Sequence, residues 1–532
     1  MLGGGNLDNE EMESVASIGS KGANVASFIL IGKFTSIILT GIAFIIVARV
    51  LGPSVYGVYT LIIGTMGILT ATGDFGISTG INKFTAELIH SKKTSEIGAL
   101  VFNSLLAVAV IGLIIAAIIF SISGFLSMYI LHTGAYKNLV EIAAFYILFT
   151  MLYDVAYGAL VGIGSKLASV QALQSGSQAA ISITLALLGF GAAAPILGLE
   201  VGLAIGFVAA IAVMHFSDGI GITARADIKK IKKIFSFSIP VGASSFLGGV
   251  ANNIGIVMLG VVSTTVIAGN FGVAAKIASL LDLIIGSIYM ASIPMFSHAL
   301  LNKNDKKIVP KLYTYAFYMA LVFVAPMVAY MAVFAKPFSY VLFSGLYKMG
   351  PEYIALVSIG TLIWLLGYYA SALMISAGEV KKVLKYNMLI FVVELIAILL
   401  LVPRFSGTGL VLSIYFASYG ATTILFFLGV RRLFGVHLNW NKVGRILLAN
   451  IIAAALAYVP YFLFPTSFIP VLVIGLAIEV GTYPILLSVT GAMTKKDFAH
   501  VKLATESIPF FGRVIKLLVD YATAIQKNQN RI

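Results

Sequence analysis

The sequence contains no cysteine and few charged residues. Without cysteine there is no disulfide framework, no thiolate metal site and no thiol catalysis. Charged residues make up 11% of the 532 residues, against about 25% in an ordinary soluble domain. Together with 60% apolar residues and a mean hydropathy of +1.02, this composition excludes a water-soluble fold.

The apolar residues are grouped in blocks of about twenty, the length that a helix needs to cross the hydrocarbon core of a bilayer. The blocks predict an all-α polytopic membrane protein with about fourteen transmembrane helices. The first 24 residues are acidic and have no basic region or cleavage site, so the first block is predicted to be an uncleaved helix. We expect the helices at residues 26–48, 55–76, 98–121, 140–163, 168–190, 195–215, 236–260, 266–296, 312–335, 351–376, 384–402, 407–429, 445–464 and 468–490.

The basic residues predict the topology, because Lys and Arg gather in cytoplasmic loops. With a cytoplasmic N-terminus, 28 of the 35 Lys and Arg residues fall on the cytoplasmic side, five on the outer side and two within helices. We therefore expect both termini in the cytoplasm and the net charge of +14 to face anionic lipid headgroups rather than nucleic acid.

An internal repeat predicts two related halves. The segments 129–137 and 340–348 share Tyr, Leu, Gly, Tyr and Lys at an offset of 211, and a weaker echo relates 56–58 to 271–273 at an offset of 215. Copies with the same orientation imply two parallel six-helix lobes, as in many transporters. The expected parts are a cytoplasmic tail at 1–24, a first lobe at 25–216, a basic linker at 217–234, a second lobe at 235–435, two additional transmembrane helices at 436–492 and an amphipathic cytoplasmic tail at 493–532.

Polar side chains in or beside the predicted helices are candidate functional residues, because a charge at the bilayer centre costs at least about 2.5 kcal/mol. The same side chains also snorkel, pair with each other or hydrogen-bond neighbouring helices in many membrane proteins. The glycines at 198, 202 and 206 fit close helix packing better than ligand binding. Candidates for binding an anionic substrate are Lys33, Lys83, Lys276, Asn252, Asn253, Gln171, Gln174 and Gln178. Candidates for ion coupling are Asp74, Asp154, Asp282 and Glu394, with Glu200 and Glu479 as further acids in predicted helices.

Patterns typical of enzymes are missing from the sequence. The six histidines have no metal-ligand spacing, and there is no phosphate-binding loop of the Walker type and no GxSxG motif. We therefore predict that the protein is not an enzyme and holds no cofactor or metal. Energy for transport would come from a proton or sodium gradient or from the substrate itself.

The segments ARVLGPSVYGVY at 48–59 and GDFGISTGINKF at 73–84 resemble the polysaccharide-biosynthesis flippases of the Wzx type. The segment LFSGLY at 342–347 looks like a second-lobe signature of that family. These flippases belong to the MOP superfamily, which also contains the MATE exporters and the lipid II flippase MurJ. Lys33 and Lys83 match positions where such sequences place basic residues, and Lys276 is a looser match.

The resemblance implies a transporter that flips an oligosaccharide linked to a polyprenyl or dolichyl (pyro)phosphate from the inner to the outer leaflet, by alternating access of two lobes around a cationic cavity. It also implies a monomer in the plasma membrane of a prokaryote, in contact with membrane lipids and with glycan-assembly enzymes. The shortage of Arg in the predicted cavity departs from bidentate phosphate recognition.

Two alternatives stay open at this point. A MATE-type exporter of drugs or organic cations would share the fold, but it would favour carboxylates in the first lobe, where Asp154 alone is prominent. A membrane enzyme of glycan assembly would need a large outer loop with catalytic residues, and the predicted loops are short.

Overall fold

The structure is a computed structural model that describes residues 9–74, 76–165, 167–223, 228–301, 308–494 and 497–498. Within these residues, the side chains of 9–34, 72–74, most of 228–245, 252, 291 and 301 are outside the described part. The regular secondary structure of the described residues is helical. Ten of their helical stretches are long and apolar enough to cross a membrane, which confirms an all-α polytopic membrane protein.

The chain divides into two compact units, Met1–Gly269 and Asn270–Ile532. The division falls inside one helix. The predicted lobe and tail boundaries therefore stay predictions, and the predicted tails at 1–24 and 493–532 and the linker at 217–234 lie partly or largely outside the described residues.

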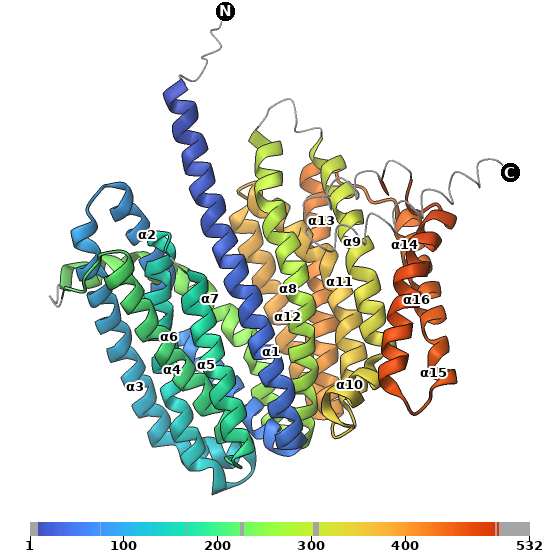
Figure 1. Cartoon of the computed structure of the whole chain (residues 1–532), viewed down its shortest axis with the longest axis horizontal. Coiled ribbons are helices and arrows are strands. Elements are labelled where there is room, and N and C mark those ends of the chain that lie inside the picture. The colour runs from blue at the N-terminus through green and yellow to red at the C-terminus, as the bar shows by residue number, and fades with distance from the viewer. Residues whose placement is uncertain are drawn as a thin grey trace, which may run out of the picture. The chain divides into compact units, whose positions relative to one another are not determined.

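The first unit is a bundle of long helices, in which α3 to α6 run side by side (Figure 1). The predicted blocks of this unit all fall on its helices. Its elements are α1 (Asn9–Asp74), α2 (Ile77–His90), η1 (Thr94–Glu96), α3 (Ile97–Leu131), η2 (Gly134–Tyr136), α4 (Lys137–Ile163), α5 (Leu167–Leu187), α6 (Ala193–Ala212), η3 (Val213–Ser217), α7 (Ile228–Val262) and the first residues of α8 (Thr265–Leu301).

A break in α1 separates the first two predicted blocks. Gly52 has φ 67° and ψ 174°, a conformation that favours glycine because it has no Cβ. Pro53 follows and has no backbone N–H to continue the helical hydrogen bonds. The two parts of α1 are therefore separate helical segments, and the second packs against α7, where Gly64 faces Ile256.

Close packing of α5 against α6 depends on the glycines of α6. A Cβ on Gly202 would lie 2.7 Å from Cβ of Gln178, and one on Gly206 would lie 2.8 Å from Cβ of Gln174. A Cβ on Gly198 would likewise overlap the side chain of Ser182. The predicted packing role of these glycines is confirmed, because any larger side chain would push the helices apart.

Both copies of the main repeat contain the end of a helix, one residue apart in the alignment of the repeat. α3 ends at Leu131 and is followed by His132 with φ 55°, while α10 ends at Phe343 and is followed by Ser344 with φ 56°. Each left-handed residue stops its helix and turns the chain. The relation of the two lobes implied by this repeat stays a prediction.

The second unit contains the remaining helices, and the predicted blocks of this unit also fall on them. A second break, at Ser406 with φ 50°, follows Pro403 and separates two predicted blocks inside α12. Its elements are the rest of α8, α9 (Val309–Val333), α10 (Ala335–Phe343), α11 (Gly350–Ser376), α12 (Val380–Val411), η4 (Leu412–Ser418), α13 (Tyr419–Phe434), α14 (Trp440–Ala457), α15 (Val459–Leu463) and α16 (Phe468–Val489).

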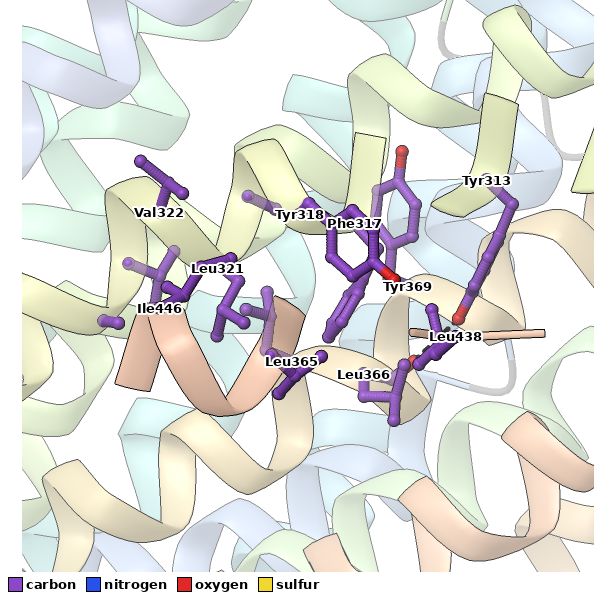
Figure 2. Packing of buried hydrophobic residues seen from close by; sticks show 14 of the residues in the cluster. Tyr313, Phe317, Tyr318, Leu321, Val322, Leu365, Leu366, Tyr369, Leu438 and Ile446 are labelled. Carbon is purple, nitrogen blue, oxygen red and sulfur yellow. Dashed lines mark hydrogen bonds between the residues drawn. The ribbon is translucent and has the colours of Figure 1, made fainter. Parts of the chain in front are cut away.

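The core of the second unit lies where α9 meets α11 and α14. Aromatic and aliphatic side chains from these helices interdigitate there, as Figure 2 shows for Tyr313, Phe317, Leu321, Leu365, Tyr369 and Ile446. Burial of this apolar surface fixes α9 against α11. The segment after α16 is attached to the same unit by polar contacts.

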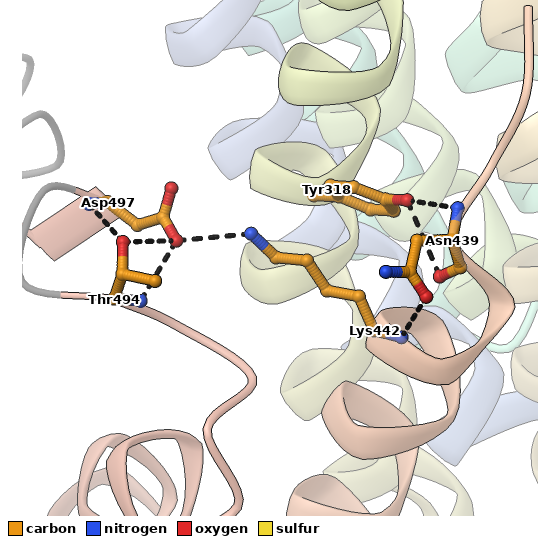
Figure 3. Close-up of polar contacts among 5 residues, drawn as sticks. All are labelled: Tyr318, Asn439, Lys442, Thr494 and Asp497. Atoms are coloured by element: carbon orange, nitrogen blue, oxygen red, sulfur yellow. Dashed lines mark hydrogen bonds and ion pairs between the residues drawn. The ribbon is translucent and has the colours of Figure 1, made fainter.

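These contacts surround Lys442 at the start of α14 (Figure 3). Its Nζ lies 3.1 Å from Oδ2 of Asp497 and 5.0 Å from the ring centre of Tyr318, whose hydroxyl accepts a hydrogen bond from the N–H of Asn439. The N–H of Thr494 donates to Asp497 at 2.9 Å. Burial by itself raises the pKa of the Asp497 carboxyl, but the hydrogen bonds from Thr494 and Lys442 outweigh it and lower that pKa below its usual value.

Candidate functional site

The second unit holds a half-buried carboxylate, Asp282, in the middle of α8. Its Oδ1 is fully buried and has no hydrogen-bond partner among the described residues. The carboxylate lies close enough to Tyr368, Tyr415 and Tyr419 for its charge to act on their hydroxyl groups. An acid in a predicted membrane helix with an unpaired oxygen is a functional candidate.

Stacked aromatic rings lie beside Asp282. The ring of Tyr368 stacks on Tyr289 at a centroid distance of 4.1 Å and on Trp364 at 3.9 Å. Trp364 also stacks on Tyr419 at 5.0 Å, and Tyr419 meets Tyr415 edge-on at 5.2 Å. We call these five rings the aromatic column. Aromatic faces next to a carboxylate attract cations, and the column joins residues from α8, α11, η4 and α13.

The column was not predicted from the sequence. The spacing of four residues between Trp364 and Tyr368, and again between Tyr415 and Tyr419, is a signal that one helix face is aromatic. That these faces meet depends on the packing of α11 against η4, where a Cβ on Gly360 would overlap Tyr415. The sequence carries no direct sign of that contact.

Glu394 forms the second acidic position of this unit. It is 7% exposed and accepts a hydrogen bond of 2.7 Å from the hydroxyl of Ser418. Ser418 ends the π-helical segment η4, and such segments often occur at functional sites. Tyr415 of the aromatic column lies in the same segment, so η4 contributes both to the column and to the contact with Glu394.

In the first unit, the predicted amides of α5 form a polar row in which Gln174 and Gln178 are hydrogen-bonded to each other. Nε2 of Gln174 donates to Gln178 at 3.1 Å, and the hydroxyl of Ser175 donates to Gln174 at 3.0 Å. The hydroxyl of Tyr157 lies 3.5 Å from Oε1 of Gln171. All three glutamines are partly exposed, so the row packs against α6 and keeps a free edge. Asn253 of α7 donates to the carbonyl of Gly249 at 2.9 Å.

Acids of the first unit lie among tyrosines. Asp154 of α4 acts electrostatically on Tyr146 and Tyr153. Glu200 of α6 is 4% exposed, and its Oε1 has no hydrogen-bond partner among the described residues. The burial of Glu200 leaves it suited to hold a proton or a small cation rather than to contact a large substrate.

The predicted basic residues occupy different elements. Lys83 lies on the short helix α2, is 46% exposed at its side chain, and pairs with Glu87 at 3.7 Å. Lys276 lies exposed on α8. The side chains of Lys33, Asp74 and Asn252 lie outside the described residues. The described residues include no group of three or more metal-ligating side chains that could hold a metal ion.

Solved structures with the same fold include three transporters. The lipid II flippase MurJ in an inward closed conformation matches with a TM-score of 0.73 at 15% identity, over 87% of this chain and 98% of that chain. An inward-facing multidrug-resistance MATE transporter gives 0.62 at 18%, over 74% and 94%. A MOP superfamily transporter from Pyrococcus furiosus gives 0.55 at 18%, over 77% and 94%.

These similarities show that the chain has the MOP-superfamily fold. No curated protein sequence matches it significantly. A family model described as "Polysaccharide biosynthesis protein" matches residues 46–349, which is more than half of the chain.

Proposed function

Because the chain belongs to the polysaccharide biosynthesis protein family, we propose that it is a flippase for an oligosaccharide linked to a polyprenyl or dolichyl (pyro)phosphate. The observation that carries this proposal is the family match together with the flippase-like fold. The lipid-linked headgroup would enter from the inner leaflet and leave in the outer leaflet as the two lobes alternate around it.

In this proposal, lysine side chains bind the phosphate. An ammonium group binds phosphate as a point charge, without the bidentate geometry of Arg. Lys83 and Lys276 are exposed residues that carry such ammonium groups, and Lys33 is assigned the same role from its sequence position. The ion pair between Lys83 and Glu87 is long and exposed, so a phosphate can replace it at little cost.

In the same proposal, amide side chains bind the sugar. Sugar hydroxyls both donate and accept hydrogen bonds, and so does each amide side chain. The free edge of the row formed by Gln171, Gln174 and Gln178 offers such groups, and Asn252 and Asn253 are the second set. A row of neutral amides fits a polar, uncharged headgroup better than it fits a metal ion or an organic cation.

The acids Asp74, Asp154, Asp282 and Glu394 are the proposed sites at which a proton or a sodium ion drives transport. Asp282 and Glu394 are the best supported, because within the described part of the chain one has a buried oxygen without a partner and the other accepts from the hydroxyl of Ser418. Asp282→Asn should remove the dependence of transport on the ion gradient. Glu352→Gln, which neutralises an exposed acid on α11, is the control. If transport by the unaltered chain is unchanged when proton and sodium gradients are collapsed, ion coupling is wrong.

The proposed setting is the plasma membrane of a prokaryote, with both termini in the cytoplasm and the protein acting as a monomer beside glycan-assembly enzymes. Depleting the protein in its host tests the function. We expect loss of the surface polysaccharide and accumulation of the lipid-linked oligosaccharide on the inner leaflet, with recovery when the chain is supplied again. Unchanged surface polysaccharide would contradict the proposal.

A MATE-type exporter of organic cations is the second candidate. It is favoured by the aromatic column beside Asp282, because aromatic faces and a carboxylate attract organic cations. Efflux of ethidium from cells that express the chain distinguishes the two functions. Efflux that is abolished by Asp282→Asn, with no effect of depletion on surface polysaccharide, would establish the exporter instead.

A further inference from the structure

A deep apolar groove lies in the second unit between α8, α9 and α16. Its volume is about 420 Å³, within the range of roughly 300 to 1,000 Å³ that is typical of small-ligand sites. Side chains such as Leu281, Val322 and Leu487 form its buried floor. The rim consists of large apolar side chains that are 39% to 48% exposed, namely Leu280, Phe323, Met327, Leu476 and Val480.

Two polar side chains interrupt the apolar floor. Glu479 and Tyr483 lie one turn apart on α16 and are 2% and 6% exposed. Both carboxylate oxygens of Glu479 and the hydroxyl of Tyr483 are buried without a hydrogen-bond partner among the described residues. The neighbouring hydroxyl of Tyr330 is already used, because it donates to the carbonyl of Leu472.

These unpaired atoms limit what can fill the groove. A hydrocarbon chain of the bilayer would cover the apolar walls but leave three polar atoms without partners, which is costly in an apolar surrounding. The described residues that line the groove include one acid, Glu479, and no Lys, Arg or His. A ligand that brings hydrogen-bond donors and a positive charge therefore complements the groove.

We propose that this groove binds an amphiphile with a single apolar chain and a primary amine. The chain lies along the apolar side chains of α8, α9 and α16, and the amine meets Glu479. An ammonium group has three donors, enough for both oxygens of Glu479 and the hydroxyl oxygen of Tyr483 once these buried side chains turn toward the groove. Charge-assisted hydrogen bonds of this kind are stronger than neutral ones, and a buried position strengthens them further. The ligand differs from the proposed anionic substrate, so this inference does not rest on the proposed function.

Photolabelling tests the proposal with the full chain in phosphatidylcholine nanodiscs, whose lipid has no primary amine. The probe is dodecylamine that carries a diazirine in its chain. We expect it to label residues of α8, α9 and α16, and excess dodecylamine to suppress the labelling while excess dodecanoic acid does not. Glu479→Gln keeps the shape of the side chain and should weaken labelling about tenfold. Glu352→Gln, an exposed residue on α11, is the matched control and should have no effect.

A variant that fills the groove and a substitute for Glu479→Gln complete the test. Val480→Trp fills the rim of the groove and should abolish labelling by the amine probe and by its dodecanol analogue alike. If Glu479→Gln does not fold, Tyr483→Phe and the competition between dodecylamine and dodecanoic acid on the unaltered chain take its place. Equal labelling by amine, alcohol and acid probes, or labelling that Glu479→Gln leaves unchanged, would mean that the groove holds bilayer chains without recognising an amine, and the proposal would be wrong.

Discussion

Gly57 and Gly269 bring two helix backbones of the first unit into direct contact. A Cβ on Gly57 would overlap the carbonyl of Thr265 and lie 2.9 Å from the nitrogen of Gly269, and a Cβ on Gly269 would overlap the carbonyl of Pro53. The hydroxyls of Ser54 and Thr265 lie 3.2 Å apart at the same crossing. The second part of α1 and the start of α8 therefore pack as closely as two helices can.

Replacing either glycine by alanine should destabilise the protein. We expect Gly57→Ala or Gly269→Ala to lower the free energy of unfolding by roughly 1 to 3 kcal/mol, because the added methyl group has no space. Thermal unfolding of the purified protein in detergent measures the effect. Gly41→Ala is the control, since a Cβ there meets nothing within 4 Å. Equal melting temperatures for Gly41→Ala and Gly57→Ala would show that the backbones are not in contact.

Removing the hydroxyl of Ser418 should leave the buried carboxylate of Glu394 without its donor. We expect Ser418→Ala to cost about 1 to 3 kcal/mol of unfolding free energy, the usual penalty for a buried acceptor left unpaired. Ser413→Ala is the matched control on η4, because that hydroxyl donates only to the carbonyl of Gly409 in its own helix. The double variant Ser418→Ala, Glu394→Leu should recover most of the unfolding free energy that Ser418→Ala loses. If its loss instead equals the sum of the losses of the two single variants, the contact between Ser418 and Glu394 is wrong.

The contact between Lys442 and Asp497 should depend on pH. The folded protein lowers the pKa of Asp497, so the contact adds stability above the ordinary carboxyl value of about 3.9 and loses it as pH falls through the lowered value. Asp497→Asn should therefore expose the segment after α16 to proteolysis at neutral pH. In pepsin digests at decreasing pH, the cleavage rates of the unaltered chain and the variant should converge as the pH falls through the lowered pKa of Asp497. A difference in cleavage rate that does not change with pH would contradict the assignment.

A comparison of two ion pairs with the same spacing separates the effect of Lys83 on protein stability from its proposed role in transport. Lys83 with Glu87 and Lys137 with Glu141 are both spaced by four residues and separated by 3.7 Å. The side chains of Lys83 and Lys137 are 46% and 56% exposed, and ion pairs of exposed lysines contribute less than about 1 kcal/mol, so Lys83→Ala and Lys137→Ala should melt at nearly the same temperature. In a reconstituted flipping assay, only Lys83→Ala should slow transport. Equal rates for the two variants would remove Lys83 from the proposed phosphate contacts.

The helices were predictable from the sequence because hydropathy and block length are local properties. All fourteen predicted blocks fall on helices, and the glycines of α6 pack as expected. The short helices α2 and α10 were not predicted, because neither has the length or the continuous apolar character of a spanning block.

The candidate site was only partly predictable. Asp282 and Glu394 stand out as acids in apolar blocks, but the rings that surround Asp282 come from helices far apart in the chain. The stack of Tyr289 on Tyr368 joins residues of α8 and α11, and no local pattern reports such a contact. Glu479 was visible as an acid, whereas its lack of a partner among the described residues follows from the apolar faces of α8 and α9 that surround it. The predicted substrate and coupling roles stay predictions.

Flipping of a defined lipid-linked oligosaccharide by the purified chain tests the central claim most directly. The protein is reconstituted in liposomes with a polyprenyl-pyrophosphate oligosaccharide in both leaflets, and an added glycosidase that cannot cross the membrane trims only outer headgroups. Protein-free liposomes should stop at about half of the substrate, the share in the outer leaflet. Liposomes that contain the chain should proceed to nearly complete trimming. Trimming that stops at one half in both would contradict the proposed function.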